Sequence, residues 1–363
     1  MVKTQTEPYL ATYLHQRGYA RGLPISGVFE LTARCNFNCP MCYVHQTGEK
    51  TGELTAAQWL KLAREARDAG MVFALLTGGE PLLRKDFFSI YQGMKELGLM
   101  ISINSNGSLL QGETLERLLQ DPPNRINISL YGGCGETYRN MCGVDAYHSV
   151  KENIRRLKQA GVDVSLNLCI TPFNKEDLPL IRADAERLNV PVRASAYLYP
   201  QSRLEAGSQT ESRLDPKEAA KFELEWENLY YGRERMAERC RELKLWLEEG
   251  CPGNPSAAGD RVSCRAGTTS FWITWEGKML PCGMVPDPEA YPLTQGFAKA
   301  WEEIREKTAA IRMPGTCASC DKRSACGVCA AVCRTETGRY DGVPVYMCQK
   351  TEEKIRLLQG TGE

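Results

Sequence analysis

Six short apolar runs alternate with longer amphipathic segments between residues 25 and 200, and this alternation constrains the fold more than any other feature. The apolar runs span residues 28–31, 72–76, 100–103, 126–130, 164–170 and 190–198. The amphipathic segments span residues 55–69, 86–97, 113–120, 149–160 and 175–188. Strands that alternate with helices predict a parallel sheet, and right-handed connections curl such a sheet toward an open barrel. We therefore expect an α/β fold, with a partial (β/α)6 TIM-like barrel.

After the barrel the sequence changes twice, first to a charged helical segment and then to a cysteine-rich one. Residues after the barrel are heavily charged, with Phe222, Trp226 and Leu229 at helical spacing, which predicts bridging helices. A cysteine-rich part follows and contains a hairpin signal over 271–280, turned at Gly277. The predicted domains are an N-terminal extension at 1–24, the barrel at 25–213, the bridging helices at 214–250 and a small Cys-rich α+β domain at 251–363.

Charge and hydropathy argue against two classes of function. The chain has 45 basic and 45 acidic residues, unlike the basic proteins that bind nucleic acid. No apolar run approaches the roughly 18 residues that a membrane-spanning helix needs. The N-terminal residues lack the apolar core of a signal peptide, so we expect a cytoplasmic protein.

Cysteine is unusually abundant, with 16 residues against 3 histidines. In a reducing cytoplasm such a count indicates metal ligands rather than disulfides. The few histidines argue against zinc sites of mixed Cys/His type and favour thiolate-rich iron–sulfur sites.

Cys35, Cys39 and Cys42 follow directly on the first predicted strand, in the spacing CxxxCxxC. Three thiolates at this spacing can supply three of the four iron ligands of a [4Fe–4S] cluster and leave the fourth iron open to a chelate. The carboxyl end of a barrel strand is also where barrel active sites lie. A zinc loop is the alternative that this placement disfavours.

The order of motifs along the barrel resembles that of the radical S-adenosylmethionine superfamily. In that family the cofactor chelates the open iron, and one electron cleaves its sulfonium to give a 5′-deoxyadenosyl radical. Thr77-Gly78-Gly79-Glu80-Pro81 resembles the segment whose backbone meets the methionyl amine. The resemblance further implies cofactor contacts by Tyr43 near adenine, by Asn104, by Ser129 at ribose or methionyl groups, and by Arg139 or Arg193 at the methionyl carboxylate.

The C-terminal cysteines resemble the SPASM extension of radical enzymes. They are Cys251, Cys264, Cys282, Cys317, Cys320, Cys326, Cys329, Cys333 and Cys348. The usual allocation in that subgroup implies one auxiliary cluster on Cys317, Cys320, Cys326 and Cys348. A second cluster would use Cys264 and Cys282 with two of Cys251, Cys329 and Cys333. A pair of zinc ribbons is the alternative that tetrahedral four-cysteine sites permit.

Cys169 stands apart from the other unassigned cysteines because it lies on a predicted barrel strand. Alternation along that strand places Asn167, Cys169 and Thr171 on one face. If this face lines the barrel, the Cys169 thiol lies near the radical and is a candidate hydrogen donor. Packing in the core is the alternative for a cysteine of this kind.

The resemblance implies that the enzyme modifies a peptide or protein. The length is similar to that of anaerobic sulfatase maturases. In those enzymes, however, an aspartate that acts as a base follows the corresponding cysteine, whereas here Gly283 follows Cys282. We therefore predict oxidative crosslinking, through a thioether or C–C bond, of a ribosomally made precursor. The base would be Glu30 or a substrate group. Formylglycine formation and epimerisation with Cys169 as donor are the alternatives.

Two further classes of function stay open at this point. A non-catalytic electron carrier would not cleave S-adenosylmethionine, and a dehydrogenase of small molecules would need a narrow, closed barrel mouth. The expected partners are a peptide or protein substrate, an electron donor of flavodoxin or ferredoxin type, and a separate leader-peptide-binding protein. An anaerobic setting is implied by the same resemblance.

Overall fold

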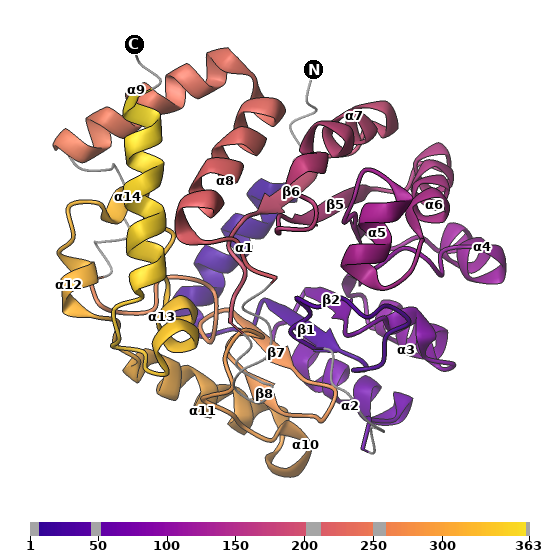
Figure 1. The fold of residues 1–363 in the computed structure, drawn as a ribbon. Helices are drawn as coiled ribbons and strands as arrows, with labels where there is room; N and C mark the ends of the chain where they lie inside the picture. Colours follow the sequence, from indigo (N-terminus) through magenta and orange to yellow (C-terminus); the bar gives the residue numbers. More distant parts are fainter. Residues whose placement is uncertain (1–6, 45–51, 201–211, 250–258, 361–363) are drawn as a thin grey trace.

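A computed structural model describes residues 7–44, 52–200, 212–249 and 259–360 (Figure 1). Its strands form one sheet in the order β6-β5-β4-β3-β2-β1-β7-β8. The strands are β1 (Ser26–Glu30), β2 (Phe73–Thr77), β3 (Met100–Ser105), β4 (Arg125–Ser129), β5 (Val164–Cys169), β6 (Val192–Ser195), β7 (Ser270–Ile273) and β8 (Met279–Leu280). Neighbours from β1 to β6 pair in parallel. The predicted α/β fold with a partial barrel is therefore confirmed, and each predicted apolar run overlaps a strand.

Helices lie at all five predicted amphipathic segments, and residues 135–142 form a further helix that was not predicted. The helices of the barrel are α2 (Ala56–Asp68), α3 (Phe87–Glu96), α4 (Gly112–Gln120), α5 (Gly135–Cys142), α6 (Tyr147–Gln159) and α7 (Leu178–Leu188), with 3-10 turns η1 (Pro81–Leu83) and η2 (Lys175–Asp177). Thr55 caps α2 in a reciprocal capping box with Gln58. Asp86 occupies the N-cap position of α3, but its side chain makes no capping bond. Its carboxylate pairs with Arg84 instead.

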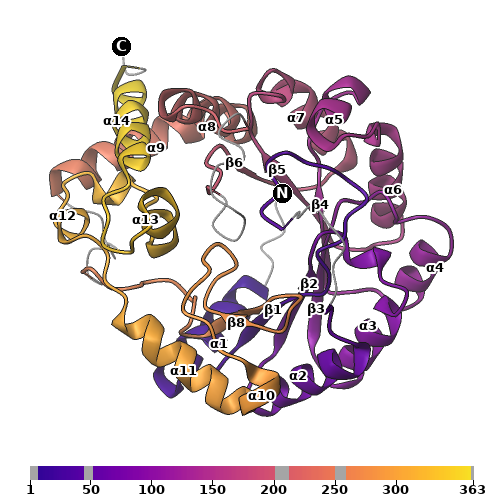
Figure 2. The ribbon, with the colours of Figure 1, turned by 60° about the horizontal axis from the view of Figure 1, so that its bottom comes forward.

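The two faces of the barrel sheet have opposite character. Strand residues on one face, such as Ile103, Ile128 and Leu166, are completely buried in one core with the helices α2 to α7. Figure 2 shows these helices on the outer side of the curved sheet. Side chains alternate along a strand, so the inner face carries the intervening residues. Many of these are polar, including Asn104 and Asn167.

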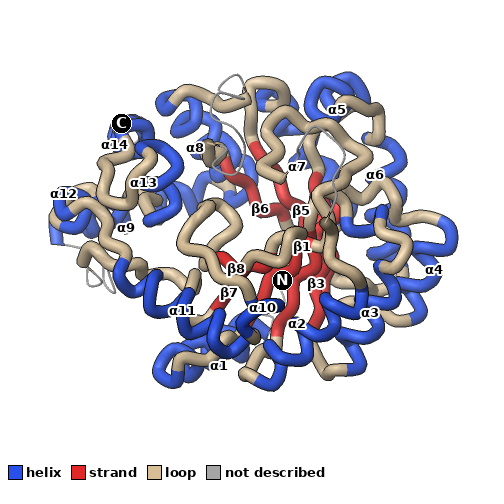
Figure 3. The backbone as a smooth tube through the Cα atoms, turned by 90° about the horizontal axis from the view of Figure 1, so that it is seen from below, coloured by secondary structure: helices blue, strands red, loops and turns tan. Residues whose placement is uncertain are grey.

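The predicted hairpin is present, and its first strand joins the barrel. β7 pairs in parallel with β1, with Ser26 opposite Ser270 and Phe29 opposite Ile273, and β8 pairs antiparallel with β7. The strands of this sheet run together through the centre of Figure 3. Phe271 packs edge-on against Phe29 at 5.9 Å and against Phe297 at 5.1 Å. The cysteine-rich part of the chain is therefore attached to the barrel through the sheet and its core.

Helices flank the barrel on the remaining sides. They are α1 (Glu7–Arg21), α8 (Pro216–Tyr231), α9 (Arg233–Glu249), α10 (Pro292–Gln295), α11 (Phe297–Ala310), α12 (Gly315–Ala318), α13 (Ala330–Thr337) and α14 (Val345–Gly360), with a 3-10 turn η4 (Arg323–Ala325). In Figure 2 the C-terminal helices complete a ring with those of the barrel. α14 packs on α8, where Glu223 pairs with both Lys350 and Lys354. In the described part of the chain, no helix is long and apolar enough to cross a bilayer.

Candidate active site

The loop that carries Cys35, Cys39 and Cys42 lies against the segment that follows β2. The backbone N–H of Gly79 donates to Thr32 O and that of Glu80 donates to Arg34 O, both at 2.8 Å. A Cβ on Gly79 would lie 2.2 Å from Arg34 O. A Cβ on Gly78, whose φ is +145°, would lie 2.3 Å from Thr32 O. Two glycines are therefore required for this approach, which joins the cysteine loop to Thr77-Gly78-Gly79-Glu80-Pro81.

The three thiols of this loop share one environment. Cys35 Sγ accepts from the Phe37 N–H at 3.4 Å, and Asn106 Nδ2 donates to it at 3.8 Å. Burial raises the pKa of Cys35 to about 11, although the Phe37 N–H opposes the shift. Glu80, Cys39 and Cys42 add to the increase, which places all of them near this thiol.

The donor set fits an iron–sulfur cluster in its chemistry. Within the described residues, no three Cys, His, Asp or Glu side chains converge on the position of a single ion. A four-iron cluster does not require that convergence, because its thiolates bind separate iron atoms. Cys35, Cys39 and Cys42 would supply three of these ligands.

Glu80 joins the loops that follow β2 and β3. Its carboxylate is completely buried and accepts from Asn106 N at 2.8 Å, Leu82 N at 3.1 Å and Ser105 Oγ at 3.0 Å. Burial raises the pKa of Glu80 to about 7, although these three donors oppose the shift. The Asn106 amide then reaches Asn36 Oδ1 at 2.8 Å. The structure thus connects the predicted cofactor segment after β2, and the loop that follows Asn104 on β3, to the cysteine loop.

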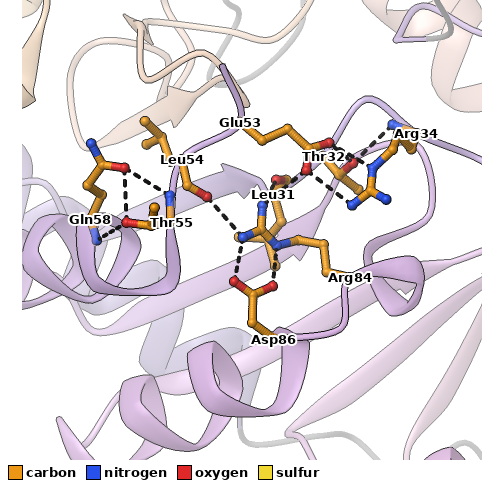
Figure 4. A network of polar contacts seen from close by, with 9 residues as sticks. All are labelled: Leu31, Thr32, Arg34, Glu53, Leu54, Thr55, Gln58, Arg84 and Asp86. Atoms are coloured by element: carbon orange, nitrogen blue, oxygen red, sulfur yellow. Dashed lines mark hydrogen bonds and ion pairs between the residues drawn. The ribbon is translucent and has the colours of Figure 1, made fainter. Parts of the chain in front are cut away.

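A buried arginine supports the start of the cysteine loop (Figure 4). Arg84 donates to Leu31 O at 2.8 Å and to Leu54 O at 2.9 Å, and forms a bidentate pair with Asp86. Glu53 lies on the same network, where it accepts from Arg34 at 3.1 Å. Arg84 was not identified from the sequence, because nothing in its local pattern indicates that it would reach two distant carbonyls.

Replacing Arg84 by methionine is expected to lower the free energy of unfolding by about 2 kcal/mol. The loss follows because two buried carbonyls lose a charged donor. Urea unfolding of Arg84→Met and of Arg67→Met measures it. Arg67 makes an exposed pair with Asp68 and should contribute little. Equal effects in the two variants would contradict the prediction.

The inner face of the barrel presents polar groups toward its interior. Asn127 Nδ2 donates to Asn104 Oδ1 at 2.8 Å, and the register places Ser129 beside Asn167. Among the described residues, two buried oxygens on this face have no hydrogen-bond partner, Asn127 Oδ1 and Ser165 Oγ. Asn104 and Ser129 therefore lie on the face where the sequence predicts cofactor contacts.

Cys169 lies on this inner face at the end nearest the cysteine loop. Burial raises the pKa of its thiol to about 11, and Cys39 and Cys42 add to the shift. The buried Asn174 fixes this end of β5, because its Nδ2 donates to Cys169 O at 2.9 Å and to Tyr131 O at 3.0 Å. β5 ends at Cys169, and the buried Thr171 beyond it directs its hydroxyl to Met141 Sδ at 3.0 Å.

Tyr43 and Glu30 meet at Trp272, which was not singled out from the sequence. Trp272 Nε1 donates to the buried Glu30 carboxylate at 2.9 Å. The rings of Tyr43 and Trp272 lie edge to face, with centroids 6.3 Å apart. Trp272 reaches this position because β7 pairs with β1, which places Trp272 opposite Val28. The sequence gives no local indication of that pairing.

The two candidate arginines lie in different settings. Arg139 is on α5, more than half exposed, and pairs with Asp145 at 2.7 Å. Arg193 is exposed on β6, where the register places it beside the inner-face residue Asn167. Only Arg193 therefore shares a face with the polar residues of the barrel interior.

Four of the C-terminal cysteines line one pocket. The residues around it include Cys317, Cys320, Cys326 and Cys348. Arg323 also lines this pocket and is 5 % exposed. Its Nη1 donates to Val328 O at 3.2 Å, while its Nε has no partner among the described residues. The structure thus brings together the four cysteines that the resemblance assigns to one auxiliary cluster.

A second group of cysteines lies near Tyr199, in the segment after β6. The Tyr199 hydroxyl lies 3.8 Å from Cys329 Sγ. Burial raises the pKa of Tyr199, and the nearby Cys329, Cys282 and Cys264 thiols raise it further. Cys333 is completely buried in α13, and burial, with Cys317, Cys329 and Cys326 nearby, raises the pKa of its thiol. Cys251 lies outside the described residues.

Comparisons with known proteins agree with this arrangement. A family model described as the radical SAM superfamily matches residues 29–185. An AdoMet-dependent heme synthase of Methanosarcina barkeri is 26% identical over 337 residues, which cover 86% of this chain and 93% of that protein.

Two solved structures share the fold at 16% sequence identity. Streptococcus suis SuiB bound to S-adenosylmethionine has a TM-score of 0.69 and covers 96% of this chain and 84% of its own. Native anSMEcpe with bound AdoMet has a TM-score of 0.71 and covers 93% of this chain and 99% of its own. These likenesses show the partial barrel with its C-terminal extension.

Proposed function

Because residues 29–185 form a radical SAM domain and the chain is a radical SAM enzyme, we propose that it oxidatively crosslinks a peptide substrate. The observation that carries the proposal is the position of Cys35, Cys39 and Cys42. They lie on a loop held by Gly79 and Glu80 at the carboxyl ends of the barrel strands.

In this proposal the chain holds the cofactor by several groups. A four-iron cluster with S-adenosylmethionine supplies, when bound and reduced, a 5′-deoxyadenosyl radical that removes a hydrogen atom from the substrate. The backbone at Gly78, Gly79 and Pro81 would meet the methionyl amine, while the Glu80 carboxylate stays bound to the loop after β3. Asn104 and Ser129 would contact the ribose or methionyl groups from the inner face, and Tyr43 the adenine.

Of the two arginines, Arg193 is the better candidate for the methionyl carboxylate. It lies on β6, beside Asn167 of the inner face. Arg139 lies on the helix α5, outside the sheet, and already pairs with Asp145. A guanidinium can bind a carboxylate through two parallel hydrogen bonds.

Crosslinking removes two hydrogens from the substrate. One leaves as a hydrogen atom, and the second leaves as a proton and an electron when the new bond forms. The C-terminal cysteines would hold the electron acceptors, one at the pocket lined by Cys317, Cys320, Cys326 and Cys348. The other would lie at Cys264, Cys282 and Cys329, with Cys251 or Cys333. The reductant that starts each cycle would be a flavodoxin or ferredoxin, and a separate protein would bind the leader peptide.

Gly283 argues against formylglycine formation by this chain. A Cβ on Gly283 would lie 2.6 Å from Trp272 Cε2, so an aspartate there would displace the indole. That indole donates to Glu30, which is a buried carboxylate. Glu30 or a substrate group would then accept the proton.

A second candidate is the oxidation of a tetrapyrrole. The heme synthase relative aligns along most of both chains, and this alignment supports a heme precursor as an alternative substrate. Such a reaction would use the same cysteines, because it also combines removal of a hydrogen atom with removal of an electron.

The test supplies reconstituted enzyme, under anaerobic conditions in D2O, with the precursor peptide encoded beside its gene or with a heme precursor. Crosslinking predicts a peptide that has lost two hydrogens, in the wild type and in Cys169→Ala alike. Gain of one deuterium, lost in Cys169→Ala and kept in the control Cys240→Ala, would establish epimerisation instead. Turnover of the heme precursor alone would establish the second candidate.

A further inference from the structure

Two tyrosines in the segment after β6 have different partners in the C-terminal part of the chain. The Tyr197 hydroxyl donates to Glu336 Oε1 at 2.8 Å. The Tyr199 hydroxyl lies 3.8 Å from Cys329 Sγ. The segment that leaves the last barrel strand thus touches a cysteine of the group around Tyr199, which includes Cys264 and Cys282.

The direction of the Tyr199–Cys329 contact follows from the state of the sulfur. In a thiol either atom could donate, but a cysteine bound to iron is a thiolate and has no proton to give. The phenol must then be the donor. We propose that Tyr199 donates a hydrogen bond to the metal-bound Cys329 thiolate and thereby raises the reduction potential of that auxiliary cluster. The inference rests on the proposed function, in so far as it requires a cluster at Cys329.

The direction of the expected change in reduction potential follows from the charge of the cluster. Reduction adds an electron to the cluster and its thiolates, and a donor aimed at a sulfur stabilises the more negative state. Hydrogen bonds to the sulfurs are among the features that set the potentials of such clusters. Tyr199 therefore acts through Cys329 as a positioning residue, and it makes this centre the better electron acceptor.

Packing holds the phenol in place. The Tyr197 and Tyr199 rings meet edge to face with centroids 5.0 Å apart, and Tyr346 packs on Tyr197 at 5.6 Å. Arg213 also pairs with Glu336, the acceptor of the Tyr197 hydroxyl, at 2.5 Å. The aromatic contacts do not need the Tyr199 hydroxyl, so Tyr199→Phe removes the donor and preserves the packing.

The experiment compares wild type, Tyr199→Phe and Tyr197→Phe as reconstituted full-length enzymes in a redox titration monitored by electron paramagnetic resonance. Tyr197→Phe is the matched control, because it removes a neighbouring hydroxyl that does not contact sulfur. A Cys329→Ser variant identifies the signal of the cluster at Cys329. The cluster at the Cys317 pocket serves as an internal reference within each sample.

In Tyr199→Phe the reduced-to-oxidised ratio of the Cys329 cluster should fall about tenfold at a fixed potential, a shift of about −59 mV for a one-electron couple. The reference cluster, the iron content and Tyr197→Phe should not change. An unshifted potential in Tyr199→Phe, an equal shift in Tyr197→Phe, or no iron signal that depends on Cys329 would each overturn the inference. A shifted potential in an enzyme that modifies no peptide would support it and reject only the proposed substrate.

Discussion

Replacement of Cys35, Cys39 and Cys42 together by alanine is expected to abolish S-adenosylmethionine cleavage and to leave the C-terminal iron in place. The two sets of cysteines lie on separate parts of the fold, one after β1 and the other in the C-terminal part, near β7 and β8 and around α12, α13 and α14. Three four-iron clusters give on the order of 12 iron atoms per chain, so the triple variant should keep about 8. Chromatography of 5′-deoxyadenosine under dithionite, with iron analysis, measures both effects.

The matched control is the double variant Cys134→Ala and Cys240→Ala, which removes cysteines outside both sets. It should retain its iron and its cleavage activity. Persistence of 5′-deoxyadenosine formation in the triple variant would refute the central assignment. Iron near four per wild-type chain, with zinc in the remainder, would instead identify the C-terminal cysteines as structural zinc sites.

Gly79→Ala is the second change with a large expected effect. The added Cβ would lie 2.2 Å from Arg34 O and 2.7 Å from Arg34 C, which are backbone atoms that cannot rotate away. The cysteine loop must then move, at a cost of about 3 kcal/mol in the free energy of unfolding. Displacing reacting groups by about 1 Å can cost on the order of 100-fold in rate, so cleavage should fall by that factor.

Thermal unfolding and the rate of 5′-deoxyadenosine formation test this prediction. Gly360→Ala is the control, because Gly360 is the last residue of α14 and a Cβ there meets nothing within 4 Å. It should be close to neutral in both measurements. A Gly79→Ala enzyme with normal stability and normal cleavage would show that the close approach of the two loops is dispensable.

The barrel could be predicted from patterns within short segments of the sequence. The strands β1 to β6 overlap the six predicted apolar runs, and Thr55 indicates the start of α2 because its capping box involves residues three apart. The grouping of Cys317 with Cys348 came from a family pattern of spacings, and it agrees with the pocket they share.

Long-range contacts account for what the sequence did not reveal. The pairing of β7 with β1 joins strands distant in the chain, and no local signal in Phe271 or Trp272 specifies a partner. The contact of Tyr199 with Cys329 and the reach of Arg84 to Leu31 O are of the same kind. They depend on the assembled fold and not on periodicity within one element.

The pairing of β1 with β7 also has a consequence for how the chain is made. On the ribosome, β1 emerges roughly 240 residues before its second neighbour, which at 5–20 residues per second means an interval of tens of seconds or less. Throughout that time one edge of the nascent sheet has no partner, and unpaired edges invite association with other chains. A fragment ending before residue 270 would keep that edge permanently. The cysteine-rich part of the chain thus supplies the strand that pairs with the β1 edge of the barrel sheet, in addition to being a candidate site for metal.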